Sequence, residues 1–288
     1  MSESIDLSLI QSNKCFGGTV YKYEHYSPSL KCRMRFNIFL PPNAPLDSTT
    51  KVPVLYFLSG LTCNEDNMIT KAGAQRLLSE QGIALVTPDT SPRNTGIPGE
   101  DDIWSIGSGA GFYVDATTDK WKEHYQMYTY IVSELPELIC SNFPINKEKS
   151  SVFGHSMGGH GAIMIALRNP GIVSAFAPIC HPSECPVGTS AFEEYLGPNK
   201  SNWLDYDPTE LASNYQSEHV NILIDQGSDD AFLKEGNLLP DHFVAAVENS
   251  KNYITLETHI QPGYDHSYWF VQTFINDHID FHAKFLKS

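Results

Sequence analysis

The interpretation of this chain is decided by residues 151–159, SVFGHSMGG, near its middle. They contain a G-x-S-x-G pentapeptide, a pattern that chance alone would place in about a tenth of chains of this length. Here an apolar strand leads into the motif, and a helix-forming run over residues 162–168 leaves it. Strand, tight turn and helix together predict a nucleophile elbow, which presents Ser156 at the end of a parallel sheet. The alternative is a glycine-rich turn without a catalytic role.

A serine hydroxyl needs a histidine to accept its proton and a carboxylate to orient that histidine. In chains with this elbow, the order along the sequence is serine, carboxylate, histidine. The apolar run over residues 220–224 predicts a strand that leads into the acidic segment 225–230. His266 follows the last predicted strand, in a short loop before the final helix. We therefore predict Ser156 as the nucleophile and His266 as its base, with a carboxylate from residues 225–230 as the third member.

The other histidines near these segments are less well placed. His259 falls inside a predicted strand, and His155 and His160 flank the serine without the spacing of a metal-binding pair. His278 and His282 lie one helical turn apart on the final helix, where we expect a solvated face. No metal site is predicted.

The negative charge that develops on a substrate oxygen requires hydrogen-bond donors that are already in place. In this type of site, one donor is the backbone N–H of the residue after the serine, here Met157. A second comes from the loop after an earlier strand. The apolar run over residues 52–58 ends in such a loop, which points to the N–H of Leu61.

Predicted strands and helices alternate along the chain. Two antiparallel strands at residues 19–26 and 32–40 would form the edge of the sheet. The other predicted strands cover residues 52–58, 83–87, 150–153, 172–177, 220–226 and 253–260, and the predicted helices cover 71–81, 120–142, 157–169, 234–249 and 267–285. The alternation predicts an α/β-hydrolase fold, with a mostly parallel central sheet and helices on both faces. Residues 1–288 form one predicted domain, and the glycine-rich segment 88–118 is expected to be an ordered wall.

The composition limits the partners and the location. A formal net charge of −15 disfavours nucleic acid and anionic membranes, because both are polyanions. The sequence holds no run of apolar residues long enough to span a membrane, and residues 1–6 lack the features of a secretion signal. The six cysteines have neither disulfide-scaffold nor zinc spacing and are expected to be free thiols. We therefore expect a cytoplasmic protein.

Along nearly its whole length, the sequence resembles the S-formylglutathione hydrolases, also called the esterase D family. The resemblance rests on residues 12–18 (SNKCFGG), 58–63 (LSGLTC), 88–93 (PDTSPR), 109–117 (GAGFYVDAT), 153–161 (FGHSMGGHG) and 263–268 (GYDHSY). One departure is Trp269, where the family often has tyrosine. This difference touches packing more than mechanism.

The resemblance implies a catalytic triad of Ser156, Asp230 and His266, because the second aspartate of the Gly-x-x-Asp segment matches the family carboxylate. It also implies oxyanion donors at Leu61 and Met157. The implied reaction is the hydrolysis of S-formylglutathione to glutathione and formate, a step of formaldehyde detoxification, by a homodimer that needs no cofactor.

Two other functions remain open on the sequence. A broad carboxylesterase or acyltransferase would use the same triad, which therefore does not separate thiolesters from other esters. A catalytically silent binding protein is disfavoured because every triad position is filled.

Cys63 matches a family thiol near the substrate entrance whose modification blocks activity. It is either a gate at that entrance or a small buried residue that packs the loop.

Overall fold

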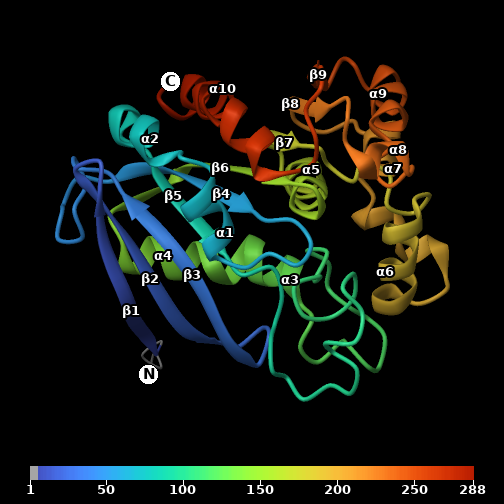
Figure 1. Ribbon diagram of the computed structural model, residues 1–288, viewed down its shortest axis with the longest axis horizontal. Helices are drawn as coiled ribbons and strands as arrows, with labels where there is room; N and C mark the ends of the chain where they lie inside the picture. The colour runs from blue at the N-terminus through green and yellow to red at the C-terminus, as the bar shows by residue number, and fades with distance from the viewer. Residues whose placement is uncertain (1–5) are drawn as a thin grey trace.

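The computed structural model describes residues 6–288 and contains one sheet of nine strands, in the order β1-β2-β3-β5-β4-β6-β7-β8-β9 (Figure 1). The first three strands pair antiparallel, and β3 pairs antiparallel with β5. All neighbouring pairs from β5 to β9 are parallel. The sheet is therefore mostly parallel, as predicted. Residues 1–5, part of the segment inspected for a secretion signal, lie outside the described residues.

The central strands are buried because helices cover both faces of the sheet, and β5 is buried along its whole length. The strands are β1 (Leu7–Cys15), β2 (Gly18–Ser27), β3 (Cys32–Leu40), β4 (Val52–Leu58), β5 (Ala84–Pro88), β6 (Ile145–His155), β7 (Ile172–Phe176), β8 (Val220–Gly227) and β9 (Ile254–Gln261).

The helices α2 and α10 lie on one face of the sheet, and α4 lies on the opposite face (Figure 1). α5 follows β6 directly and packs on β6 and β7. The helices are α1 (Asp66–Lys71), α2 (Gln75–Gln81), α3 (Met127–Thr129), α4 (Leu135–Asn142), α5 (Met157–Arg168), α6 (Pro186–Leu196), α7 (Pro208–Ser213), α8 (Ala231–Lys234), α9 (Pro240–Glu248) and α10 (Tyr268–Leu286). A π-helical segment at Tyr130–Glu134 and 3-10 turns at Lys200–Asn202 and Leu204–Tyr206 complete the set in residues 6–288.

Every predicted strand is present, but the predicted edge is wrong. β1 lies outside β2 and forms the edge of the sheet. This strand is exposed along most of its length, and a register shift between Leu9 and Gln11 interrupts its pairing with β2. An exposed, bulged strand has no alternation of apolar and polar residues, so the period-two signal is missing.

The helix predicted over residues 120–142 is shorter and irregular. Its helical part begins at Met127, and its middle, Tyr130–Glu134, is π-helical. Pro136 lies in the first turn of α4, directly after this segment. Proline has no N–H and its ring clashes with the carbonyl four residues earlier, so a regular α-helix cannot run through this point.

His278 and His282 are completely buried against the sheet, which corrects the expectation of a solvated face. His278 Nε2 lies 2.8 Å from a carboxylate oxygen of Asp225, and its Nδ1 lies 2.7 Å from Ser174 Oγ. Ser174 Oγ lies 2.8 Å from His282 Nε2, and His282 Nδ1 lies 2.6 Å from Ser151 Oγ. Because every ring nitrogen has a partner, the two histidines can be buried, and they fasten α10 to β6, β7 and β8.

Burial keeps these imidazoles neutral. It lowers the pKa of His282 to about 3 and also lowers the pKa of His278, even though Asp225 opposes the shift. The pKa values of His155 and His160 fall to about 3 and about 4 for the same reason. An unfolded histidine has a pKa near 6.5, so between about pH 4 and 6.5 the unfolded chain binds protons that the folded chain does not. Acid therefore stabilises the unfolded state.

We predict that the free energy of unfolding decreases as the pH falls from about 6.5 to 4. Each histidine that titrates only in the unfolded chain contributes about 1.4 kcal/mol per pH unit. His282→Gln removes one such group while keeping a side chain that can bond to the serines, so the slope should become shallower by about one proton. Denaturant titrations across this pH range measure it. The matched control is His219→Gln at an exposed histidine, and an equal change in both variants would contradict the prediction.

None of the helices in residues 6–288 combines the length and the apolar character that a membrane crossing requires.

Candidate active site

Ser156 occupies the turn between β6 and α5 with φ of 57° and ψ of −119°, a conformation that an L-residue adopts only when its surroundings enforce it. The surroundings do so by close backbone contact. A Cβ atom on Gly154 would lie 2.2 Å from the carbonyl oxygen of Gly158, and one on Gly158 would lie 1.9 Å from that of Leu58. The N–H of Ser156 donates to the carbonyl of Phe176 at 2.9 Å. The strand, turn and helix expected around the pentapeptide are therefore present.

Asp230 and His266 form a hydrogen-bonded pair. Asp230 follows β8 and His266 follows β9, so two neighbouring parallel strands bring them to the same edge of the sheet. His266 Nδ1 lies 2.6 Å from Oδ2 of Asp230. The buried carboxylate also accepts hydrogen bonds from the side chain of Gln226 at 3.1 Å and from the N–H of Phe232 at 2.8 Å. Burial raises the pKa of Asp230, but the hydrogen bond and charge of His266, with the hydrogen bonds from Gln226 and the N–H of Leu233, hold it below the ordinary value.

The other aspartates of the segment 225–230 lie apart from this pair. Asp229 is exposed, with its carboxylate 3.3 Å from the ammonium of Lys234. Asp225, in β8, is hydrogen-bonded to His278 of α10. Within residues 6–288, His266 therefore contacts Asp230 and neither of the other two.

Ser156 and His266 both line one cavity of ≈ 290 Å³. The imidazole of His266 packs between two rings, with 4.6 Å between its centroid and that of His155 and 4.6 Å to that of Phe232. Trp104 also lines this cavity. Phe232 and His155 were not assigned to the site from the sequence, because no motif reports which side chains pack against a catalytic ring.

The backbone N–H groups of Leu61 and Met157 are free beside the serine. Leu61 lines the cavity, and a Cβ atom on Gly60 would lie 3.1 Å from Cβ of Ser156, so the loop after β4 passes next to the serine. Met157 begins α5, where the first N–H groups have no partner inside the helix. In the described part of the chain, neither N–H donates to another backbone carbonyl. The structure thus brings together the residues predicted for the site.

Known proteins are similar in sequence to this chain along nearly its whole length. The Esterase family model matches residues 27–281. The S-formylglutathione hydrolase of Rattus norvegicus is 54% identical over 287 residues, covering 99% of this chain and 100% of the rat protein. That of Arabidopsis thaliana is 50% identical, with 98% of each chain covered. The chain belongs to the S-formylglutathione hydrolase family. A solved S-formylglutathione hydrolase structure from Agrobacterium tumefaciens, 43% identical, superposes with a TM-score of 0.91 over 96% of this chain and 99% of that one.

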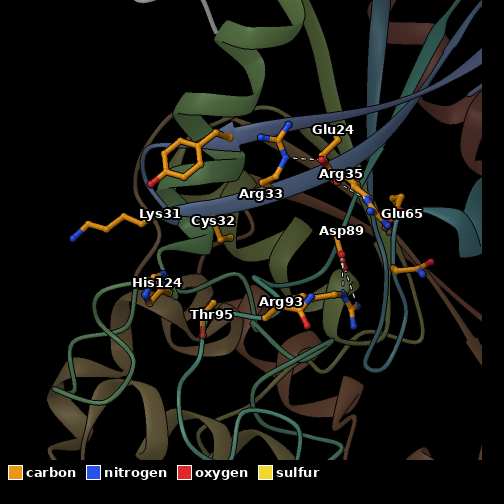
Figure 2. Close-up of a pocket in the computed structure, with 13 residues that line it drawn as sticks. Glu24, Lys31, Cys32, Arg33, Arg35, Glu65, Asp89, Arg93, Thr95 and His124 are labelled. Carbon is orange, nitrogen blue, oxygen red and sulfur yellow. Dashed lines mark hydrogen bonds and ion pairs between the residues drawn. The ribbon is translucent and has the colours of Figure 1, made fainter. Parts of the chain in front are cut away.

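Two family segments that carried the resemblance, PDTSPR and GAGFYVDAT, support the loop after β4. Arg93 donates to the carbonyl oxygen of Cys63 at 3.0 Å, and the hydroxyl of Thr90 donates to the same oxygen at 2.6 Å. Arg93 is held in turn by two hydrogen bonds to buried Asp89, at 2.8 and 2.9 Å (Figure 2). These contacts hold in place the loop that carries Leu61. The role of Arg93 was not predicted, because a contact to a backbone carbonyl leaves no pattern in the sequence.

The segment 88–118 forms the ordered wall that was expected. Phe112 and Tyr113 are completely buried, and the hydroxyl of Tyr113 donates to the carbonyl of Ser59 at 2.8 Å. The N–H of Thr62 donates to the carbonyl of Gly109 at 2.9 Å. The wall therefore packs against the same loop that Arg93 fixes.

Cys63 lies in the cavity wall, partly buried. Burial raises the pKa of its thiol, against the opposing effects of the Lys71 ammonium and the Tyr268 hydroxyl. A thiol with a raised pKa is mostly protonated at neutral pH and is a weak nucleophile. This environment fits a gate at the cavity better than a second nucleophile.

The histidines that flank the serine serve other contacts. His160 Nε2 lies 2.8 Å from the carbonyl oxygen of Tyr206, and His155 packs against His266. No group of three or more histidine, cysteine, aspartate or glutamate side chains in residues 6–288 is arranged to hold a metal ion.

The assignment of Asp230 is tested by exchanging each neighbouring aspartate. Asp230→Asn should lower kcat about 10⁴-fold, because an amide no longer fixes the tautomer of His266. Asparagine also caps helices well, so the start of α8 should remain folded. Asp229→Asn, at an exposed neighbour, is the matched control and should keep nearly full activity. Kinetics with an aryl ester, together with circular dichroism, measure both, and a larger loss at Asp229 would refute the assignment.

The gate hypothesis for Cys63 is tested with a bulky maleimide. The reagent should inactivate the protein by filling the cavity, and faster as the pH rises toward 9, because the raised pKa limits the thiolate at neutral pH. Cys63→Ser should keep most of its activity and become insensitive, whereas Cys140→Ser should remain sensitive. A folded Cys63→Ser variant as inactive as Ser156→Ala would place Cys63 in the chemistry. A wild-type protein that ignores the reagent would make Cys63 a packing residue.

Proposed function

We propose that this protein is a serine hydrolase that cleaves S-formylglutathione to glutathione and formate, with Ser156, His266 and Asp230 as its catalytic triad. The observation that carries the proposal is the hydrogen-bonded pair of Asp230 and His266, which shares a cavity with Ser156. The rat and Arabidopsis S-formylglutathione hydrolases match over nearly the whole chain and support the choice of substrate.

In the first half of the reaction, Ser156 attacks the formyl carbon. Asp230 accepts a hydrogen bond from Nδ1–H of His266, so Nε2 is the nitrogen that takes the serine proton. The N–H groups of Leu61 and Met157 donate to the oxyanion of the tetrahedral intermediate. The carbon–sulfur bond then breaks, glutathione leaves with the proton carried by His266, and a formyl ester of Ser156 remains.

In the second half, water replaces the thiol. His266 takes a proton from the water as its oxygen attacks the formyl ester, and the same two N–H groups stabilise the second oxyanion. The bond to Ser156 breaks, the serine oxygen regains a proton from His266, and formic acid leaves and ionises to formate in solution. The chain's own side chains supply every proton transfer, so the proposed reaction requires no cofactor.

A thiolester suits this site for a chemical reason. A thiol has a pKa near 8.5, far below that of an alcohol, so it departs with little help. The demand on the protein is therefore the activation of Ser156 and the stabilisation of the oxyanion. A formyl group is also the smallest acyl group, which suits a cavity of ≈ 290 Å³.

A second candidate is a broad carboxylesterase that uses the same triad. The match to the Esterase family favours it, as does a cavity whose walls include the aromatic rings of Trp104 and Phe232. We propose this as a side activity.

The cellular setting is part of the proposal. We propose that the protein acts in the cytoplasm on a small molecule, without nucleic acid or a membrane as partner, in keeping with its net charge of −15. A homodimer is proposed on the family resemblance alone, and the mass in sedimentation measures it.

The proposed function is tested by comparing kcat/KM for S-formylglutathione with kcat/KM for simple aryl and alkyl esters. S-Formylglutathione should be preferred by at least about tenfold, and Ser156→Ala should lose about 10⁵–10⁶-fold in kcat on all of them. Ser8→Ala, at an exposed serine of the edge strand β1, serves as the control. A preference for the esters would favour the carboxylesterase, and substantial turnover by Ser156→Ala would refute the proposed nucleophile.

A further inference from the structure

The catalytic cavity has no charged partner for the peptide part of a glutathione thiolester. Its ≈ 290 Å³ is at the lower limit of the roughly 300–1,000 Å³ of typical ligand sites. None of its lining residues, all within residues 6–288, is a lysine, arginine, aspartate or glutamate. The tripeptide carries two carboxylates and one ammonium, and each extended residue spans about 3.5 Å. Its net negative charge meets a protein of net charge −15, so binding requires a local cation.

A second hollow of ≈ 570 Å³ lies next to this cavity. Tyr268 connects the two, because its ring lines the hollow and its centroid lies 5.8 Å from that of His155 in the cavity wall. Ser267, which lines the hollow, also directly follows His266 in the sequence. We call it the Lys71 groove and define it by its lining residues, which are Lys71, Ser267, Tyr268, Trp269 and Gln272.

Lys71 supplies the positive charge of the groove. It ends α1, is exposed, and places its ammonium 5.5 Å from the ring centroid of Tyr268. Unlike many lysines of the described chain, Lys71 makes no ion pair within residues 6–288. The Lys71 ammonium also opposes the rise in the pKa of the thiol of Cys63, which lines the cavity. An unpaired cation thus lines the groove.

The rest of the groove is free of acidic side chains and offers contacts to a peptide. Trp269 is 73% exposed and presents a flat apolar surface to methylene groups. Gln272 carries an amide that can bond to a peptide group. The adjacent acid, Asp265, uses Oδ1 to accept hydrogen bonds from the N–H and the hydroxyl of Ser267, at 3.0 and 2.7 Å.

A larger pocket of ≈ 580 Å³ beside β2 and β3 contains more cations, but they already have partners (Figure 2). Glu24 accepts hydrogen bonds from Arg33 at 2.5 Å and from Arg35 at 3.0 Å. Arg93 is bound to Asp89. A substrate carboxylate in this pocket would compete with existing ion pairs, whereas at Lys71 it would meet an unpaired ammonium.

We propose that the Lys71 groove binds the peptide portion of the thiol leaving group, with the Lys71 ammonium paired to one of its carboxylates. This inference rests on the proposed function and assigns the subsite that would favour a glutathione thiolester over neutral esters. Lys71 contacts the leaving group and not the reacting carbon. Its effect therefore depends on the charge of the thiol part and is independent of the acyl group.

The test compares two thiolesters with the same formyl group, S-formylglutathione and the uncharged S-formyl-N-acetylcysteamine. In Lys71→Met, the ratio of kcat/KM for the first to kcat/KM for the second should fall about tenfold, as expected for the loss of one charge-assisted contact. Lys71→Arg should restore most of the ratio because it keeps the charge. High salt should lower the ratio of the wild-type protein and not that of Lys71→Met.

Lys51→Met is the matched control, because it changes the net charge equally. Lys51 precedes β4 at its amino end, whereas the site lies at the carboxyl ends of the strands. An unchanged ratio in Lys71→Met would overturn the proposed role of the Lys71 groove and leave the proposed function standing. An equal loss on both substrates would also overturn it, since Lys71 would then act on the fold or on the chemistry. Failure of the wild-type protein to cleave S-formylglutathione would refute the proposed function and the groove with it.

Discussion

The close approach of β4, β6 and α5 around Ser156 is the constraint on which the site depends. Backbone meets backbone there because Gly154 and Gly158 carry no Cβ atom. The contact forces the serine into a conformation whose strain is of the order of 1–3 kcal/mol, offset by the burial of α5 along nearly its whole length. The same contact brings the loop with Leu61 beside the serine. One packing arrangement therefore orients the proposed nucleophile and one of its oxyanion donors together.

Buried hydrogen bonds also hold α10 against the sheet. His278 and His282 bond to groups of β6, β7 and β8, and every ring nitrogen is used, which is the condition under which a buried polar network stabilises a structure. The loop with His266 connects β9 to this helix, so its path is limited at both ends. The position of the proposed base therefore depends on hydrogen bonds that never touch the cavity.

The sequence was informative wherever a residue's role is set by its own strand or turn. The run into Ser156, the apolar segment 52–58 and the strand before Asp230 each carry a local signal, so the parallel sheet and the order of the site residues could be predicted. The choice of Asp230 over Asp229 came from the family resemblance alone, since both follow the same strand. What failed depends on distant packing. His278 and His282 have the spacing of an exposed helix face, and only partners from three strands make that face an interior one. β1 has no pattern because neither of its faces is fully buried.

The two edges of the sheet bear on whether strands of other molecules can extend it. An edge strand exposes unpaired N–H and C=O groups, to which a strand of another molecule can add. β1 interrupts that row with the irregularity between Leu9 and Gln11, and β9 presents Glu257 and His259 on its exposed surface. Bulges and charged side chains make a poor template for growth of the sheet. Leu9 and Ile10, though exposed and apolar, therefore lie where continuous pairing with a strand of another molecule is least favourable.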